Sequence, residues 1–122
     1  TQIVPGRGHY NWSHEPAAYA ARSGSVKWKG GTTEGSVWTI SQHEHERKGK
    51  HASQKPIECM GRPIRNHGTR RDTVYDPFLG TGTTTVAAER LGRGSFGMEL
   101  DPAYMAVILE RLESEGCEIS RL

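Results

Sequence analysis

Residues 76–84 bring a carboxylate, two glycines and a row of hydroxyls together, a set suited to binding a small charged ligand. The stretch reads Asp-Pro-Phe-Leu-Gly-Thr-Gly-Thr-Thr and lies between a short β-prone run and a helix-forming run. Glycines let the backbone approach a ligand closely, and the first turn of a helix offers free N–H donors to an anion. The stretch therefore predicts a binding loop rather than an ordinary turn.

Three kinds of ligand loop compete for this stretch. A phosphate-binding loop needs a lysine after its last glycine, where Thr83 stands, so that interpretation fails. A dinucleotide loop needs a small residue at Thr85 and an uninterrupted apolar strand, and residues 76–78 disfavour it. The third interpretation is a ligand with both an ammonium and a carboxylate. Asp76 would pair with the ammonium, and the helix start at Thr83 and Thr84 would take the carboxylate, as in an amino-acid-bearing nucleoside.

Glu99 is a second candidate binding residue, because it lies 23 residues after Asp76 and at the end of the next predicted strand. In βαβ nucleotide sites an acid at this place accepts hydrogen bonds from the ribose hydroxyls. Asp101 stands before a proline, and we interpret it as the N-cap of the last helix. Asp76 and Glu99 therefore form the predicted polar pair of the site.

The elements that must position these residues alternate between helix and strand, which predicts an α/β fold with a parallel sheet. The expected elements are a helix over 56–66, shortened or kinked by a proline, a strand over 73–75, a helix over 83–91, a strand over 94–100 and a helix over 102–114. The first half is irregular, with helical turns over 15–22, short strands over 26–29 and 36–40, and a polar surface loop over 41–50. We accordingly divide the chain into residues 1–50 and 51–122.

Composition excludes two classes of protein. The 122 residues are 34% hydrophobic and hold no run of 18 apolar residues, which excludes a membrane span. Two cysteines exclude a disulfide framework and favour a cytoplasmic protein with reduced thiols. The histidines near residue 45 have the wrong spacing for one helical face, so we expect no metal site.

Charge is distributed unevenly along the chain. Residues 1–56 hold eight Lys or Arg against four Glu, whereas residues 57–122 hold eight Arg against ten acidic residues. The first half therefore either faces a polyanion or carries ordinary surface charge. Its aromatic residues either stack on bases between the basic residues or pack a small core. The candidate nucleic-acid contacts are Lys27, Trp28, Lys29, Arg47, Lys48 and Lys50.

Three segments, residues 51–56, 75–84 and 97–104, in this order resemble the cofactor half of DNA amino-methyltransferases. These enzymes methylate adenine N6 or cytosine N4 with S-adenosylmethionine. In the circularly permuted class, a TQKP-type motif, here Ser-Gln-Lys-Pro at 53–56, precedes the DPF–glycine loop and the acidic strand end. Residues 12–20 also resemble phage-type members of restriction-modification systems. The resemblance implies a partial Rossmann-like methyltransferase sheet of helix-β-α-β-α order.

The resemblance also implies particular contacts with S-adenosylmethionine. The TQKP-type motif would border the methionine end, Asp76 would meet the amino group, and the glycine loop would hold the carboxylate. Glu99 would take the ribose hydroxyls, Leu100 would lie near the adenine, and Phe78 would line the pocket. The implied cofactor-binding residues are Ser53, Gln54, Lys55, Pro56, Asp76, Pro77, Phe78, Gly80, Gly82, Thr83, Thr84, Glu99 and Leu100.

The family's catalytic tetrapeptide, a polar residue followed by Pro-Pro and an aromatic residue, does not occur among the six prolines of the sequence. We therefore assign no catalytic residue, and we expect the C-terminal part of a methyltransferase that is inactive alone. Adenine N6 is expected as the target rather than cytosine N4. The alternative is a non-catalytic module that binds cofactor or DNA, or a subunit complemented by a partner chain. An exposed sheet edge and face would favour a homo-oligomer.

Overall fold

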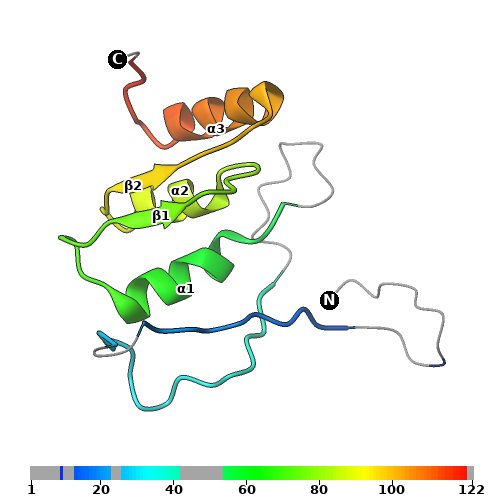
Figure 1. The fold of residues 1–122 in the computed structure, drawn as a ribbon, viewed down its shortest axis with the longest axis vertical. Helices are drawn as coiled ribbons and strands as arrows, with labels where there is room; N and C mark the ends of the chain where they lie inside the picture. The colour runs from blue at the N-terminus through cyan, green and yellow to red at the C-terminus, as the bar shows by residue number, and fades with distance from the viewer. Residues whose placement is uncertain (1–8, 10–12, 23–25, 42–53, 121–122) are drawn as a thin grey trace.

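The computed structural model describes residues 9, 13–22, 26–41 and 54–120. Its elements are α1 (Ile57–His67), β1 (Val74–Asp76), α2 (Thr83–Arg90), β2 (Ser95–Gly97) and α3 (Pro102–Ser114). Figure 1 shows α1 on the β1 side of the two strands and α3 on the β2 side. The predicted helix-β-α-β-α order is confirmed. None of the helices in the described part is long and apolar enough to cross a membrane.

The two strands pair in parallel, and α2 connects them. The register sets Val74 opposite Ser95, Tyr75 opposite Phe96 and Asp76 opposite Gly97. Met98 extends the ladder, because its N–H donates to the Asp76 carbonyl at 3.0 Å. Parallel pairing brings the carboxyl ends of β1 and β2, and with them the predicted binding residues, to one edge of the sheet.

The buried core is small and centred on α2. Val86, Ala87 and Ala88 on α2 are fully buried, together with Ile108 on α3. By contrast, Tyr75 and Phe96, which face each other across the strands, are 62% and 71% exposed. Within the described residues, one face of the sheet therefore packs against α2 and the other carries uncovered aromatic side chains.

Local signals explain where the helices begin and continue. The Asp101 carboxylate accepts a hydrogen bond from the Ala103 N–H at 2.8 Å, so the predicted N-cap of α3 is confirmed. Proline at the first helical position of α3 costs nothing, because its missing N–H would have no partner there. α1 continues through Pro63 to His67, so the helix is not shortened at this proline, and the alternative of a kink stays a prediction.

The predicted helical turns over 15–22 and the short strands over 26–29 and 36–40 do not form. Residues 13–22 are all exposed, and a helix this short without a buried face is marginal in water. The two β-prone runs have no pairing strand among the described residues, and isolated short strands are unstable. The expectation for residues 42–50 lies outside the described residues.

The same segments instead contact α1. The rings of Tyr19 and His67 stack at 5.0 Å between centroids, and Trp28 meets His67 edge-on at 5.1 Å. The guanidinium of Arg62 lies 5.2 Å from the Trp38 ring, within the range of a cation–π contact. Side chains of α1 thus contact residues 13–22 and 26–41, which have no regular secondary structure. Figure 1 shows this part of the chain running beside α1.

Candidate functional site

Asp76 ends β1, and both oxygens of its carboxylate are fixed by the loop that follows. Oδ1 accepts from the Phe78 N–H at 2.9 Å, and Oδ2 accepts from the Thr84 hydroxyl at 2.6 Å. The second bond joins the end of β1 to the first turn of α2. The Thr84 side chain therefore fixes the orientation of the Asp76 carboxylate. An ionised carboxylate has about four acceptor positions, so Asp76 can still accept from an ammonium.

Two glycines give the loop its shape, and they face opposite surroundings. Gly80 and Gly82 have φ values of +55° and +76°, in the region that side chains other than glycine disfavour. A Cβ on Gly82 would lie 2.8 Å from Ile108 Cγ1, whereas a Cβ on Gly80 would meet no atom within 4 Å. Gly82 is thus the point where α3 packs on the loop, and Gly80 faces open space.

Glu99 connects the end of β2 to the same loop. Its Oε2 accepts from the Gly80 N–H at 2.7 Å, and its Oε1 accepts from the Asp101 N–H at 2.9 Å. The carboxylate predicted to hold a ribose therefore lies against the glycine loop, across the sheet edge from Asp76. Its remaining lone pairs can accept further hydrogen bonds. The structure brings the two predicted acids to one edge, as parallel pairing requires.

The N-terminus of α2 opens at this edge, where Asp76 reaches its first turn through Thr84 and no residue of α2 itself supplies an anion. Its N-cap is Gly82, which offers no side-chain cap, and its first turn contains no acidic residue. The first N–H groups of a helix lack intrahelical acceptors and carry the positive end of the helix dipole. Thr81, Thr83 and Thr84 are each less than a tenth exposed, so this helix end is well enclosed. The arrangement suits a carboxylate.

The part of the TQKP-type motif that the structure describes borders the loop. The Lys55 carbonyl accepts from the Thr83 hydroxyl at 3.4 Å, while the Lys55 ammonium pairs with Glu15. Gln54 and Pro56 are half-buried beside them, and Ser53 lies outside the described residues. The motif and the glycine loop, about 30 residues apart in sequence, thus meet in space.

Apolar side chains surround the open side of the edge. Phe78 and Leu100 are 87% and 97% exposed, whereas Pro77 between Asp76 and Phe78 is half-buried. We call the exposed residues of the strands and the loops that follow them the apolar strand surface. It consists of Tyr75, Phe78, Phe96, Met98 and Leu100. Monomeric domains rarely leave aromatic residues gathered in this way without a ligand or partner.

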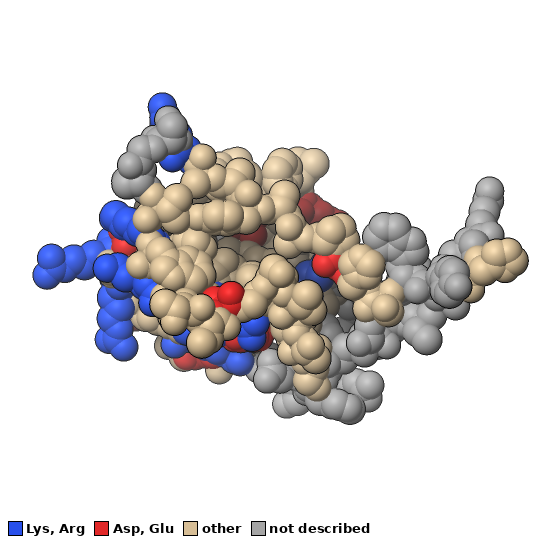
Figure 2. Space-filling view, turned by 90° about the horizontal axis from the view of Figure 1, so that it is seen from below, with Lys and Arg blue, Asp and Glu red and all other residues tan. Residues whose placement is uncertain are grey.

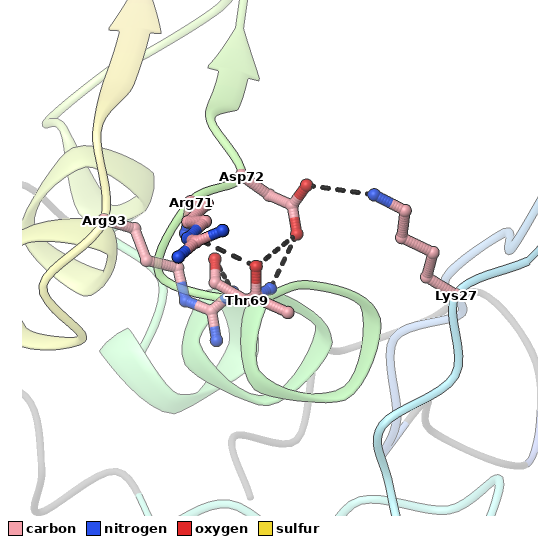
Figure 3. A network of polar contacts seen from close by, with 5 residues as sticks. All are labelled: Lys27, Thr69, Arg71, Asp72 and Arg93. Atoms are coloured by element: carbon pink, nitrogen blue, oxygen red, sulfur yellow. Dashed lines mark hydrogen bonds and ion pairs between the residues drawn. The ribbon is translucent and has the colours of Figure 1, made fainter.

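The candidate nucleic-acid contacts that the structure describes, Lys27, Trp28 and Lys29, lie elsewhere, near the end of α1 and the turn that leads to β1. The Lys27 ammonium lies 3.2 Å from Asp72 Oδ1, and the other Asp72 oxygen accepts from the Thr69 N–H at 2.8 Å. Figure 3 shows both contacts. The Thr69 N–H, helped by the Thr69 hydroxyl and Lys27, lowers the pKa of Asp72 to about 2. Lys27 is therefore held by a carboxylate that stays ionised, although its side chain is 65% exposed.

The other five candidates divide into two sets. Trp28 packs edge-on against His67 but remains 48% exposed, and the Lys29 N–H donates to the Asn66 carbonyl at 2.7 Å. The remaining three, Arg47, Lys48 and Lys50, lie outside the described residues. The tryptophan thus has a packing role on α1 and an exposed side as well.

Sequence reasoning missed Arg111, which reaches the loop from α3. Its guanidinium Nη1 donates to the Thr81 carbonyl and lies 3.4 Å from the Thr81 hydroxyl oxygen. The only sequence signal for this contact was its spacing of three from Ile108, which places both side chains on one face of the helix. No local pattern pointed from residue 111 to residue 81.

Comparisons with known proteins identify the family of the chain. The N6_N4_Mtase family model, described as DNA methylase, matches residues 6–110. The chain is 41% identical over 82 residues to the type II methyltransferase M2.DpnII of Streptococcus pneumoniae, covering 66% of this chain and 31% of that protein. It is 37% identical over 86 residues to M.HinfI of Haemophilus influenzae, covering 65% of this chain and 24% of that protein. The chain thus spans less than a third of these relatives.

A solved structure shares the fold over a larger region. The crystal structure of the M1.HpyAVI–SAM complex superimposes with a TM-score of 0.64 at 28% identity, covering 74% of this chain and 45% of that chain. The described residues thereby form part of the Rossmann-like fold of the methyltransferases, as predicted. Together with the matched family model, which extends over most of the sequence, this establishes that the chain belongs to the N6/N4 DNA methylase family.

Proposed function

We propose that this chain is the S-adenosylmethionine-binding portion of a DNA amino-methyltransferase. The observation that carries the proposal is the edge where β1 and β2 end, with Asp76 and Glu99 flanking the uncapped N-terminus of α2. The cofactor named in the M1.HpyAVI complex supports the choice of ligand. Residues 51–122 form the cofactor-binding half in this proposal, within the permuted motif order.

The chemical groups of S-adenosylmethionine match the groups at this edge. Asp76 accepts hydrogen bonds from the ammonium, and Glu99 accepts from the vicinal ribose hydroxyls. The Gly80 N–H already donates to Glu99, so the carboxylate of the ligand is held mainly by the N–H groups of Thr83 and Thr84. Gly80, which faces open space, lets the backbone approach the ligand closely, while Gly82, the other proposed glycine contact, lets Ile108 of α3 pack behind the loop.

Apolar and motif residues complete the proposed site. Phe78 closes over the ligand and Leu100 lies against the adenine, because both are exposed at the same edge. The remaining proposed contacts are Ser53, Gln54, Lys55, Pro56, Pro77 and Gly80, which border the methionine end. No step of the reaction is assigned to any of these residues, which bind and orient the ligand.

When bound, S-adenosylmethionine supplies a methyl group on a sulfonium. Its transfer breaks the sulfur–carbon bond, forms a bond to the amino nitrogen and releases a proton and S-adenosylhomocysteine. The family's polar-Pro-Pro-aromatic tetrapeptide is not present in the sequence. We therefore infer that the chain binds the cofactor but needs another polypeptide segment for methyl transfer. The proposed target is the N6 amino group of adenine in DNA.

DNA is the proposed partner of the basic residues. Lys27 and Trp28 are exposed enough to contact a phosphate and a base, and Lys29, Arg47, Lys48 and Lys50 belong to the same proposed set. Figure 2 shows Lys and Arg side chains gathered on the side where Figure 1 places the turns before β1 and β2. Binding of duplex DNA should then weaken steeply with added salt.

Isothermal titration calorimetry with S-adenosylmethionine tests the proposed cofactor site. Asp76→Asn and Glu99→Gln should each weaken binding about tenfold or more, because each removes a charged acceptor. Asp72→Asn is the matched control: it neutralises a carboxylate at the opposite end of β1 and should leave the affinity unchanged. Absence of binding by the unaltered chain at millimolar ligand would refute the proposal.

A further inference from the structure

α3 packs directly on the glycine loop through residues three apart on one helix face. Ile108 is 2% exposed and fills the space where a Cβ on Gly82 would lie. Arg111 is the next residue on this face, one turn further along α3. α3 therefore contacts the loop through one apolar side chain, Ile108, and one cationic side chain, Arg111.

The Arg111 guanidinium holds several polar atoms of the segment that leads into α2. Its Nη1 donates to the Thr81 carbonyl and lies 3.4 Å and 3.5 Å from the hydroxyl oxygens of Thr81 and Thr83. Both threonines are 7% exposed, so these contacts are shielded from water. Hydrogen bonds from a charged donor in such surroundings are about twice as strong as neutral ones.

The position of this cation is electrostatically unusual. Helix N-termini attract anions, and a guanidinium beside one is disfavoured by the helix dipole. α2 has no acidic residue in its own first turn and no side-chain cap, so the acids that partly offset the added charge come from outside the helix: Asp76, which is hydrogen-bonded to Thr84, and Glu115, whose pKa Arg90 and Arg111 lower. Arginine stays protonated at any physiological pH, so it cannot relieve the repulsion by losing its proton. An anion bound at this helix end would be attracted by both the guanidinium and the dipole.

From this geometry we propose that Arg111 is a positioning residue for the carboxylate of the bound amino-acid moiety. It fixes Thr81 and Thr83 so that the first N–H groups of α2 face the ligand, and it adds positive potential behind them. The inference rests on the proposed cofactor site but adds a residue, on a different helix, that determines specificity for the carboxylate. It predicts that Arg111 matters for the amino-acid end of the ligand and not for the nucleoside end.

Two ligands separate this role from a merely structural one. S-adenosylmethionine carries the carboxylate, whereas 5′-methylthioadenosine keeps the adenosine and lacks the amino-acid moiety. In calorimetric titrations of the whole chain, Arg111→Met should weaken binding of S-adenosylmethionine about tenfold. Binding of 5′-methylthioadenosine should change less than twofold. Arg111→Lys should recover part of the lost affinity, because it restores the charge without the planar donor geometry.

Arg93→Met is the matched control. Arg93 also donates from its guanidinium to a backbone carbonyl, that of Thr69 at 2.8 Å, but it follows the C-terminus of α2. Its removal should leave the ratio of the two affinities unchanged. Circular dichroism of each variant, with the binding of 5′-methylthioadenosine, reports whether the fold and the nucleoside site are intact.

The outcomes are distinguishable. If the unaltered chain binds S-adenosylmethionine and Arg111→Met binds it equally well, the role of Arg111 is refuted and the cofactor site stands. Equal losses for both ligands would also refute it, because they would indicate a general structural effect. If the unaltered chain binds neither ligand, both the proposed function and the proposed role of Arg111 are refuted.

Discussion

Replacing Gly82 with alanine should destabilise the chain far more than the same change at Gly80. Both glycines belong to one loop and both have positive φ, so backbone strain is common to the two variants. They differ in what the added methyl group meets. At Gly82 it would lie 2.8 Å from Ile108 Cγ1 and 3.1 Å from Cγ2, but at Gly80 it would meet no atom within 4 Å.

The expected magnitudes follow from these two terms. A residue with a Cβ in the left-handed region costs about 1–2 kcal/mol, which applies to both variants. Forcing a methyl group into a packed contact costs about 1–3 kcal/mol more, which applies only to Gly82→Ala. We therefore expect the free energy of unfolding to fall by about 1–2 kcal/mol for Gly80→Ala and by about 2–5 kcal/mol for Gly82→Ala. A loss near the upper value is a large part of the stability of any small domain.

Urea unfolding followed by circular dichroism measures the difference, provided that the slope with denaturant is unchanged between variants. A double-mutant cycle with Ile108→Ala assigns the cause. That change removes Cγ1 and Cγ2 and leaves Ile108 Cβ, at 3.3 Å, as the remaining contact, so the cost of Gly82→Ala in its background should fall toward that of Gly80→Ala. Equal costs for the two glycine variants, or no coupling to Ile108, would refute the idea that α3 determines the glycine at this position.

Two further predictions concern charge and association. Thr69 and Lys27 hold the pKa of Asp72 at about 2, below its usual 3.8. The ionised carboxylate therefore stabilises the fold above about pH 4, and this contribution is lost as the pH falls toward 2. The urea midpoint should fall over that window, and less so in Asp72→Asn; identical pH profiles would contradict this. The apolar strand surface should make the chain self-associate, so light scattering should give a mass above 13.5 kDa that rises with concentration. The double variant Tyr75→Ser and Phe96→Ser should be monomeric, and a monomeric unaltered chain would contradict the prediction.

The sequence predicted the second half of the fold well because its signals are local. Asp101 followed by proline defines the start of α3, and the loop between Asp76 and α2 is determined by the nine consecutive residues 76–84. The strand predicted over 94–100 is shorter, Ser95–Gly97, because β1 offers only three residues to pair with it. The N-cap and the loop depend on residues close in the chain, whereas the length of β2 depends on its partner strand.

Features that depend on distant residues were not predictable in the same way. The β-prone runs near Trp28 and Trp38 looked like strands because propensity is local, whereas a strand also needs a partner. The contact of Arg111 with Thr81 joins residues 30 apart, and the bond of Glu99 to Gly80 joins residues 19 apart. For Glu99 the strand-end pattern identified the residue but not its bond to the loop. For Arg111 no pattern existed.

Among the described residues, the hydrogen bonds that the structure shows for the glycine loop lie between Lys55 and Arg111, within one continuous stretch of chain. The loop geometry is therefore inherited as a unit by any gene that carries this stretch. Such a stretch can be placed before or after other coding segments without disturbing the bonds of Asp76 or Glu99, because none of them crosses its boundaries. A change in the order of the motifs along the gene therefore need not alter the geometry of the loop.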